Sequence, residues 1–154
     1  MLMDNLYIQN ILLLIGAYLL GSIPTSVWIG KVFYGIDIRE HGRGNAGTSN
    51  TFRILGAKAG IPVFIIDVLK GWAAVKLIYF SGYYIPATGD YINIQLLLGV
   101  ASLLGHIFPL YVGFKGGKGV ATLLGIVIAI HPYAALVSFG IWAVSIRRRT
   151  RYRY

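Results

Sequence analysis

The stretch ILLLIGAYLLG at residues 11–21 lies in a segment, residues 5–30, that contains no charged residue. About 20 helical residues are enough to cross the roughly 30 Å hydrocarbon core of a bilayer. This segment is therefore predicted to form a first membrane-spanning helix. Pro24 lies inside it and predicts a kink near one membrane face, where neighbouring helices can satisfy the freed backbone carbonyl.

The composition of the whole chain points to the same class of protein. Hydrophobic residues make up 56% of the 154 positions and charged residues 12%, which is too apolar for a soluble domain. Further spanning helices are predicted at about residues 60–80 and 91–114. We therefore predict an all-α, polytopic membrane bundle, with residues 1–146 as one membrane-embedded domain and residues 147–154 as an atypical basic tail.

The net charge of +9 could suggest a nucleic-acid partner, but its distribution does not. Five basic residues crowd into residues 147–154, and the others flank apolar segments. The predicted partner is the lipid bilayer, and no nucleic-acid partner is expected. Residues 31–58 are rich in lysine and arginine, whereas the loop at residues 81–94 has neither. The positive-inside rule then places the basic stretch in the cytoplasm and the N-terminus outside.

The last apolar segment, residues 119–146, is interrupted by His131-Pro132. A simple fourth crossing would place the arginines at residues 147–149 outside, against the positive-inside rule. Two short half-helices hinged at His131-Pro132 would return the chain to the cytoplasmic side. Both a fourth span and a hairpin are possible, and the charge pattern favours the hairpin.

Two glycine-rich loops could bind oxyanions. The first, EHGRGNAGTSNTFR at residues 40–53, combines glycines with small polar side chains and two arginines, which suit a phosphate but also occur in ordinary turns. The second, GFKGGKGVAT at residues 113–122, leads a lysine and glycines into a helix, whose N-terminus attracts anions. Its spacing does not match the nucleotide-binding P-loop. Both loops are predicted to face the same compartment.

Other ionisable residues are interpreted mainly as structural. Asp67 and Lys70 are three residues apart on one helix face and could form an ion pair. His106 could pack between helices or lie near the second loop, and packing is the favoured interpretation. His131 precedes the proposed hinge on the far side, where a catalytic role is not expected. The histidines have no carboxylate cluster beside them, so no metal site is predicted.

Taken together, the segments GSIP (21–24), residues 42–53, DVLKG (67–71), LGH (104–106) and GGKGVAT (116–122) resemble the acyl-phosphate-dependent glycerol-3-phosphate acyltransferase family. The resemblance covers about residues 10–145. It implies transfer of a fatty acyl group from acyl phosphate to the 1-hydroxyl of glycerol-3-phosphate, giving lysophosphatidic acid in phospholipid synthesis. It also implies a multi-pass protein of the bacterial inner membrane, with active loops in the cytoplasm and no metal or other cofactor.

The resemblance also assigns site residues, which fall in the two loops. Lys118 and Arg53 are expected to be catalytic through electrostatic stabilisation of the reacting groups. The residues expected to bind substrate are Asn45, Gly47, Ser49, Asn50, Gly116, Gly117 and Gly119.

The chain departs from the family pattern in two places. Arg43 occupies the position of a small hydroxyl residue in the family's Gly-Ser-Gly-Asn sequence, and the family's His-Arg-x-Asn segment near the C-terminus has no counterpart here. These departures leave open an inactive, truncated member of the family. A transporter of phosphate or organophosphates is another alternative, which would place binding groups near the membrane midplane.

Overall fold

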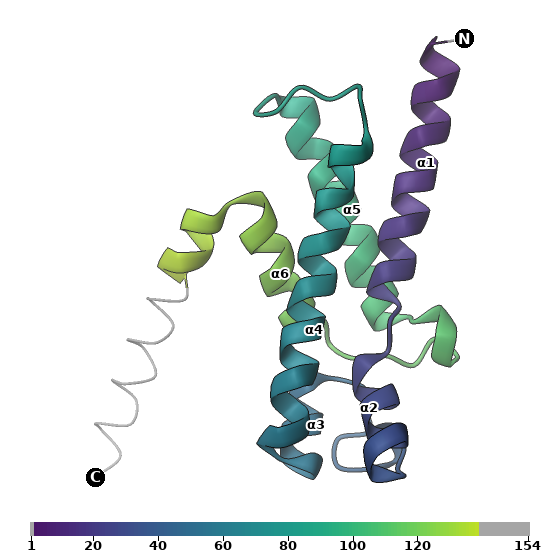
Figure 1. The fold of residues 1–154 in the computed structure, drawn as a ribbon, viewed down its shortest axis with the longest axis vertical. Helices are drawn as coiled ribbons and strands as arrows, with labels where there is room; N and C mark the ends of the chain where they lie inside the picture. The colour runs from purple at the N-terminus through teal and green to yellow at the C-terminus, as the bar shows by residue number, and fades with distance from the viewer. Residues whose placement is uncertain (1, 139–154) are drawn as a thin grey trace.

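The computed structural model describes residues 2–138, and the protein is helical throughout that range, with no strand (Figure 1). The α-helices are α1 (Leu2–Gly21), α2 (Thr25–Tyr34), α3 (Thr48–Leu55), α4 (Ala57–Lys76), α5 (Gly89–Ile107) and α6 (Val120–Ile130). The 3₁₀ turns are η1 (Ile38–Glu40), η2 (Leu77–Phe80) and η3 (Leu110–Val112). The predicted all-α membrane bundle is confirmed. The predicted basic tail lies outside the described residues.

The break between α1 and α2 occurs at Pro24, where the sequence predicts a kink. Proline lacks an N–H and interrupts the hydrogen-bond ladder, leaving carbonyls upstream without helical partners. The carbonyl that loses its i+4 partner at Pro24 is that of Leu20, and it accepts a hydrogen bond of 3.3 Å from the Ile23 N–H instead. The Ile23 carbonyl beside the break accepts a hydrogen bond of 2.8 Å from Lys70 Nζ of α4. A neighbouring helix thus contacts the break, while the freed carbonyl is satisfied within the turn itself.

The helix α4 lies at the centre of the bundle and contacts α1, α2, α3, α5 and α6. A small core between α1, α4 and α5 is formed by Leu13, Ala17, Ala74, Ile78, Ile94 and Leu98. The contact of α4 with α6 depends on glycine. A Cβ atom at Gly125 would overlap the Val68 carbonyl oxygen and lie 3.0 Å from the Trp72 nitrogen. Only a residue without a side chain lets these two backbones approach so closely.

A short helix, α3, was not predicted within the basic stretch at residues 31–58. The segment TSNTFRIL has few apolar residues and is flanked by glycines, a pattern that is typical of a loop. The α3 helix packs on α4, and Asn50 of α3 is buried. The observed α4 also begins three residues earlier than the predicted start at Gly60.

The helix α6 has 11 residues, about 16 Å of helix, which is too short to span a bilayer. It ends at Ile130, and helical structure resumes over residues 132–138 in a different direction (Figure 1). His131 Nδ1 accepts a hydrogen bond of 3.2 Å from the Ala134 N–H, so it caps the start of the second segment. This geometry agrees with the predicted hinge, while the return to the cytoplasmic side falls on residues outside the described range.

Two stretches are long and apolar enough to cross a membrane, Asn5–Tyr34 and Gly89–Val112. The α-helix of the second stretch, α5, ends at Ile107, earlier than the predicted end at residue 114. Both stretches run toward the end of the molecule that holds α2 and α3, with the N-terminus at the opposite end (Figure 1).

An ion-pair cluster centred on Asp37, which lies outside these stretches, ties η1 to η3. Asp37 pairs with Arg39 at 2.7 Å and with Lys31 at 3.2 Å, and Arg39 Nη1 donates to the Val112 carbonyl at 2.6 Å. Hydrogen bonds from the Arg39 side chain, and secondarily from the Arg39 N–H and Lys31, hold the pKa of the Asp37 carboxyl well below its usual range despite partial burial.

The close approach of α4 and α6 can be tested with Gly125→Ala. The added methyl group must displace the Val68 backbone, and overpacking of this kind costs about 1–3 kcal/mol. We expect a lower thermal midpoint in detergent, followed by the helical circular dichroism signal. Gly82→Ala is the matched control, because a Cβ at Gly82 meets nothing within 4 Å. Equal midpoints for the two variants would contradict the close packing.

The Asp37 cluster predicts a pH dependence of stability. Because the pKa of Asp37 is lowered in the folded state, its stabilisation is complete above the unfolded pKa of about 4 and is lost as the pH falls further. The thermal midpoint of Asp37→Asn should therefore fall less steeply than that of the unmodified chain between about pH 4 and pH 2. Glu40→Gln, on the same turn, should keep the steeper fall. Parallel curves for Asp37→Asn and the unmodified chain would contradict this role.

Candidate functional site

The first glycine loop is held in shape by Asn50, whose side chain is 1% exposed. Its Nδ2 lies 3.0–3.1 Å from the carbonyl oxygens of Ile38, His41 and Asn45. Its Oδ1 accepts a hydrogen bond of 2.9 Å from the Arg43 N–H. These bonds occupy both the nitrogen and the oxygen of the Asn50 side-chain amide, so the residue stabilises the conformation of the loop. Its predicted contact with substrate would have to compete with them.

Two helices begin beside this loop without a side-chain cap. The α3 helix starts after Gly47, and its first N–H groups, at Thr48 and Ser49, have no partner within the helix. The α6 helix starts after Gly119, which has φ +74° and likewise provides no capping side chain. Uncapped helix N-termini carry partial positive charge and free N–H donors, and both attract anions.

The two glycine loops are in direct contact. The Ala46 N–H donates to the Gly116 carbonyl at 3.1 Å, and the Gly117 N–H donates to the His106 carbonyl at 3.2 Å. A Cβ atom at Gly117 would lie 2.9 Å from the Ala46 oxygen and 3.0 Å from the Gly47 Cα. The absence of a side chain at Gly117 therefore allows the two loops to meet.

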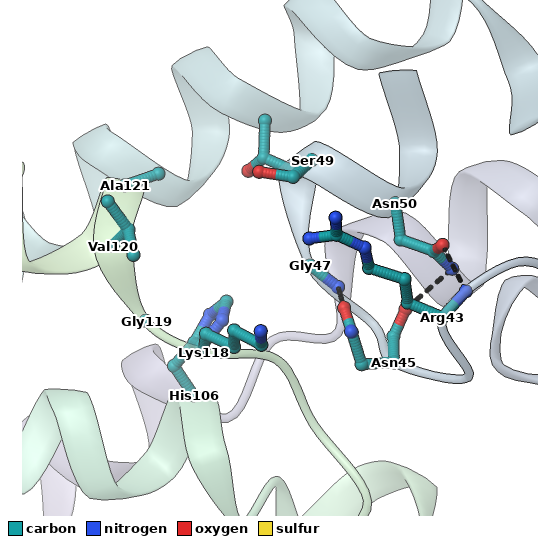
Figure 2. A pocket seen from close by; sticks show the side chains of 11 residues that line it. Arg43, Asn45, Gly47, Ser49, Asn50, His106, Lys118, Gly119, Val120 and Ala121 are labelled. Atoms are coloured by element: carbon teal, nitrogen blue, oxygen red, sulfur yellow. Dashed lines mark hydrogen bonds between the residues drawn. The ribbon is translucent and has the colours of Figure 1, made fainter. Parts of the chain in front are cut away.

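A cavity of about 190 Å³ lies between these loops and the starts of the two helices (Figure 2). It is lined by Arg43, Asn45, Gly47, Thr48, Ser49, Asn50, His106, Lys118, Gly119, Val120 and Ala121. The α3 and α6 N-termini thus converge on one space. Figure 2 shows the Arg43 and Lys118 side chains beside this space, each from a different loop.

Most of the predicted site residues lie at this cavity. Those that line it are Asn45, Gly47, Ser49, Asn50, Lys118 and Gly119. Gly116 and Gly117 lie in the loop directly behind it. Arg53 is on the last turn of α3 with an exposed side chain, and it is not among the cavity-lining residues. The structure thus brings one of the two predicted catalytic cations into the cavity.

Several lining residues were not predicted to belong to the site. Arg43 was predicted as one of the two arginines of the first loop and as a departure from the family pattern, but not as a site residue, although its side chain borders the cavity. His106 was interpreted as a packing residue, and it lines the same cavity from the end of α5. The LGH and GGKG segments were the available signal for His106, because they lie ten positions apart, at His106 and Gly116, on either side of Pro109.

A buried polar cluster lies behind the cavity. The Asp67 carboxylate accepts hydrogen bonds of 3.2 Å from the hydroxyls of Thr25 and Thr48 and pairs with Lys70 Nζ at 2.9 Å. His106 Nδ1 is 3.9 Å from Asp67 Oδ1. The predicted Asp67–Lys70 ion pair is therefore present. Within residues 2–138, no three side chains of the metal-binding types gather as a possible metal site.

Known proteins with similar sequences share one description. The family model described as glycerol-3-phosphate acyltransferase matches residues 11–153. The glycerol-3-phosphate acyltransferase of Streptococcus pneumoniae strain Taiwan19F-14 is 49% identical over 135 residues, covering 85% of this chain and 60% of the relative. The one from strain Hungary19A-6 is 48% identical over the same length and the same shares.

Solved structures show the same relationship. The integral membrane glycerol 3-phosphate acyltransferase PlsY (YgiH), in its glycerol 3-phosphate form, is 43% identical with a TM-score of 0.75. That match covers 87% of this chain and 64% of PlsY. The lysophosphatidic acid form matches with a TM-score of 0.72 and shares of 86% and 62%.

The similarity extends over most of this chain, which spans about 60% of the length of the curated relatives it matches. Its helices follow those of an integral membrane protein at a high TM-score, which agrees with the two apolar spanning stretches. Sequence and structure lead to one conclusion: this chain belongs to the glycerol-3-phosphate acyltransferase family, and it has that family's helical membrane fold.

Proposed function

We propose that this chain transfers a fatty acyl group from acyl phosphate to the 1-hydroxyl of glycerol-3-phosphate, forming lysophosphatidic acid. The observation that carries the proposal is the single cavity on which two helix N-termini, Arg43 and Lys118 converge. The names of its relatives supply the acceptor, because the similar PlsY structures are of a glycerol 3-phosphate form and a lysophosphatidic acid form.

The cavity has the chemistry needed to hold a phosphate group. The N–H groups at the start of α3 and of α6 can donate hydrogen bonds to phosphate oxygens. Lys118 adds a positive charge from the second loop and Arg43 adds another from the first. An arginine can bind phosphate through two parallel hydrogen bonds, whereas a lysine acts as a compact charge.

The protein has little covalent chemistry to perform in this reaction. An acyl phosphate is a mixed anhydride and is already activated, so the protein must align the hydroxyl with the carbonyl carbon. It must also stabilise the negative charge that develops on the carbonyl oxygen and on the departing phosphate. Lys118 lines the cavity, and its positive charge supports a proposed role in this stabilisation. Arg53 remains a predicted catalytic residue, acting from outside the observed cavity.

The site is proposed to face the cytoplasm of a bacterial inner membrane. The cavity is lined by residues of the two basic loops and of the start of α3. Helices α2 and α3 lie at the end of the molecule opposite the N-terminus (Figure 1). The positive-inside rule places such loops in the cytoplasm. A cavity formed by loops in one half of the bundle also disfavours the transporter alternative, which requires a site near the midplane.

The direct test is to purify the full chain in detergent and measure lysophosphatidic acid formation from radiolabelled glycerol-3-phosphate. Acyl phosphate should act as the acyl donor, and an acyl thioester of coenzyme A should not. Product formed only from the thioester would overturn the proposed donor. A folded chain that forms no product from either donor would overturn the proposed activity.

The same assay tests the two predicted cations. Lys118→Ala removes a charge-assisted hydrogen bond worth about 1.5–3 kcal/mol, so kcat/KM should fall about 10- to 100-fold. Lys115→Ala is the matched control, since Lys115 lies in the same loop but is not among the cavity-lining residues. Arg53→Ala should lower kcat/KM less than Lys118→Ala. A larger fall in kcat/KM for Arg53→Ala than for Lys118→Ala would indicate that the reacting groups bind outside this cavity.

A further inference from the structure

The short helix α2 is not needed for the chain to cross a membrane. The helix α1 has 20 residues, about 30 Å of helix, and this length alone spans the hydrocarbon core of a bilayer. Pro24 separates α2 from α1, and α2 lies at the end of the molecule opposite the N-terminus (Figure 1). The ten residues of α2 therefore follow a crossing that α1 can complete without them.

One face of α2 is buried in the protein and the other is exposed. Val27 and Gly30 are buried, and the helix packs on α4. On the outside, Val32 is 74% exposed, Phe33 is 75% exposed and Trp28 is about half exposed. These side chains are large and apolar. A group of exposed apolar side chains marks a surface that contacts a membrane or another molecule.

The exposed face of α2 continues onto the turn η3. The rings of Trp28 and Tyr111 pack together, with their centroids 6.3 Å apart and their planes tilted by 39°. Leu110 and Phe114, on either side of Tyr111, are about half exposed as well. We call these residues of α2 and η3 the aromatic surface: Trp28, Val32, Phe33, Leu110, Tyr111 and Phe114.

Positive charge accompanies the aromatic surface. Lys31 lies on the exposed part of α2, and Lys115 is exposed directly after the turn that contains η3. The Asp37 carboxylate pairs with both Lys31 and Arg39, so one negative charge faces two positive ones. Residues 28–58 as a whole contain five basic and two acidic residues. This end of the protein thus combines exposed aromatic rings with an excess of cations.

This combination fits the headgroup layer of a phospholipid bilayer. Tryptophan and tyrosine are enriched at the membrane–water interface, where their rings lie at headgroup level. Lysine side chains beside them can extend their charge to the phosphate groups of the lipids. The surface also adjoins the bilayer-crossing part of the molecule, where α4 exposes Ile61, Ile65 and Leu69. A partner that contacts only the aromatic surface would leave this continuity unexplained.

We infer that α2 and η3 form a membrane-interface anchor, in which the aromatic surface lies among phospholipid headgroups and α2 is not part of the spanning helix. Thr25 at the start of α2 and Thr48 at the start of α3 both donate to the Asp67 carboxylate. The anchor is thereby coupled to the wall of the main cavity. A cavity held at this depth can receive an acyl donor from the bilayer and a water-soluble acceptor. Only this last consequence rests on the proposed function.

The depth of α2 can be measured with nitroxide spin labels, because the chain has no cysteine of its own. Val32→Cys labels the aromatic surface, Ile65→Cys labels the exposed face of α4, and Glu40→Cys labels an exposed loop position. Each full-length variant is reconstituted, without other proteins, into vesicles of phosphatidylcholine and phosphatidylglycerol. Electron paramagnetic resonance then compares collisions with oxygen, which concentrates in hydrocarbon, and with a nickel chelate, which stays in water.

The oxygen-to-nickel collision ratio at Val32→Cys should lie between the high ratio at Ile65→Cys and the low ratio at Glu40→Cys. A ratio equal to that of Glu40→Cys would overturn the inference, because the surface would then face water. A ratio equal to that of Ile65→Cys would also overturn it, because α2 would then continue the spanning helix. Phe33→Cys should repeat the intermediate ratio, and it decides alone if Val32→Cys does not fold.

This readout does not depend on activity. A chain that gives the intermediate ratio but forms no lysophosphatidic acid would overturn the proposed function and leave the anchor standing. An active chain whose Val32 and Phe33 labels behave as if in water would overturn the anchor alone.

Discussion

The buried ion pair between Asp67 and Lys70 in the middle of α4 connects this helix to α2, to α3 and to the break between α1 and α2. Breaking a buried pair by removing one partner is strongly destabilising, because the other charge stays buried without compensation. Here both members also hold other segments: Lys70 binds the Ile23 carbonyl next to Pro24, and Asp67 binds Thr48 at the start of α3. One pair thus connects the break between α1 and α2 with the wall of the cavity.

Much of the fold could be predicted from the sequence because the membrane imposes a simple length and polarity rule. The charge-free segment around residues 11–21, the break at Pro24 and the hinge at His131-Pro132 follow from local chemistry. The α3 helix could not be predicted, because it is stabilised by contacts with α4 and by the bonds of Asn50 to three distant carbonyls. The close contact at Gly125 could not be predicted either, because the sequence around a glycine in an apolar segment does not distinguish a position that faces lipid from one that faces another helix.

The site was partly predictable for a related reason. The glycines and Lys118 follow from motif resemblance and from the known affinity of helix N-termini for anions. The contact between the two loops, through Ala46 and Gly116, could not be predicted. It depends on the positions of α5 and α6 in the bundle, and these do not follow from any local sequence pattern. His106 was interpreted as a packing residue because a single buried histidine has no signature in sequence. Its position between the cavity and Asp67 emerges only in three dimensions.

We propose that the space between the starts of α3 and α6 binds the phosphate of glycerol-3-phosphate. A crystal structure of this chain with glycerol-3-phosphate tests it most directly. Phosphate oxygens should lie within hydrogen-bonding distance of Lys118 and of the N–H groups that begin the two helices. A phosphate bound elsewhere, with this cavity empty, would contradict it.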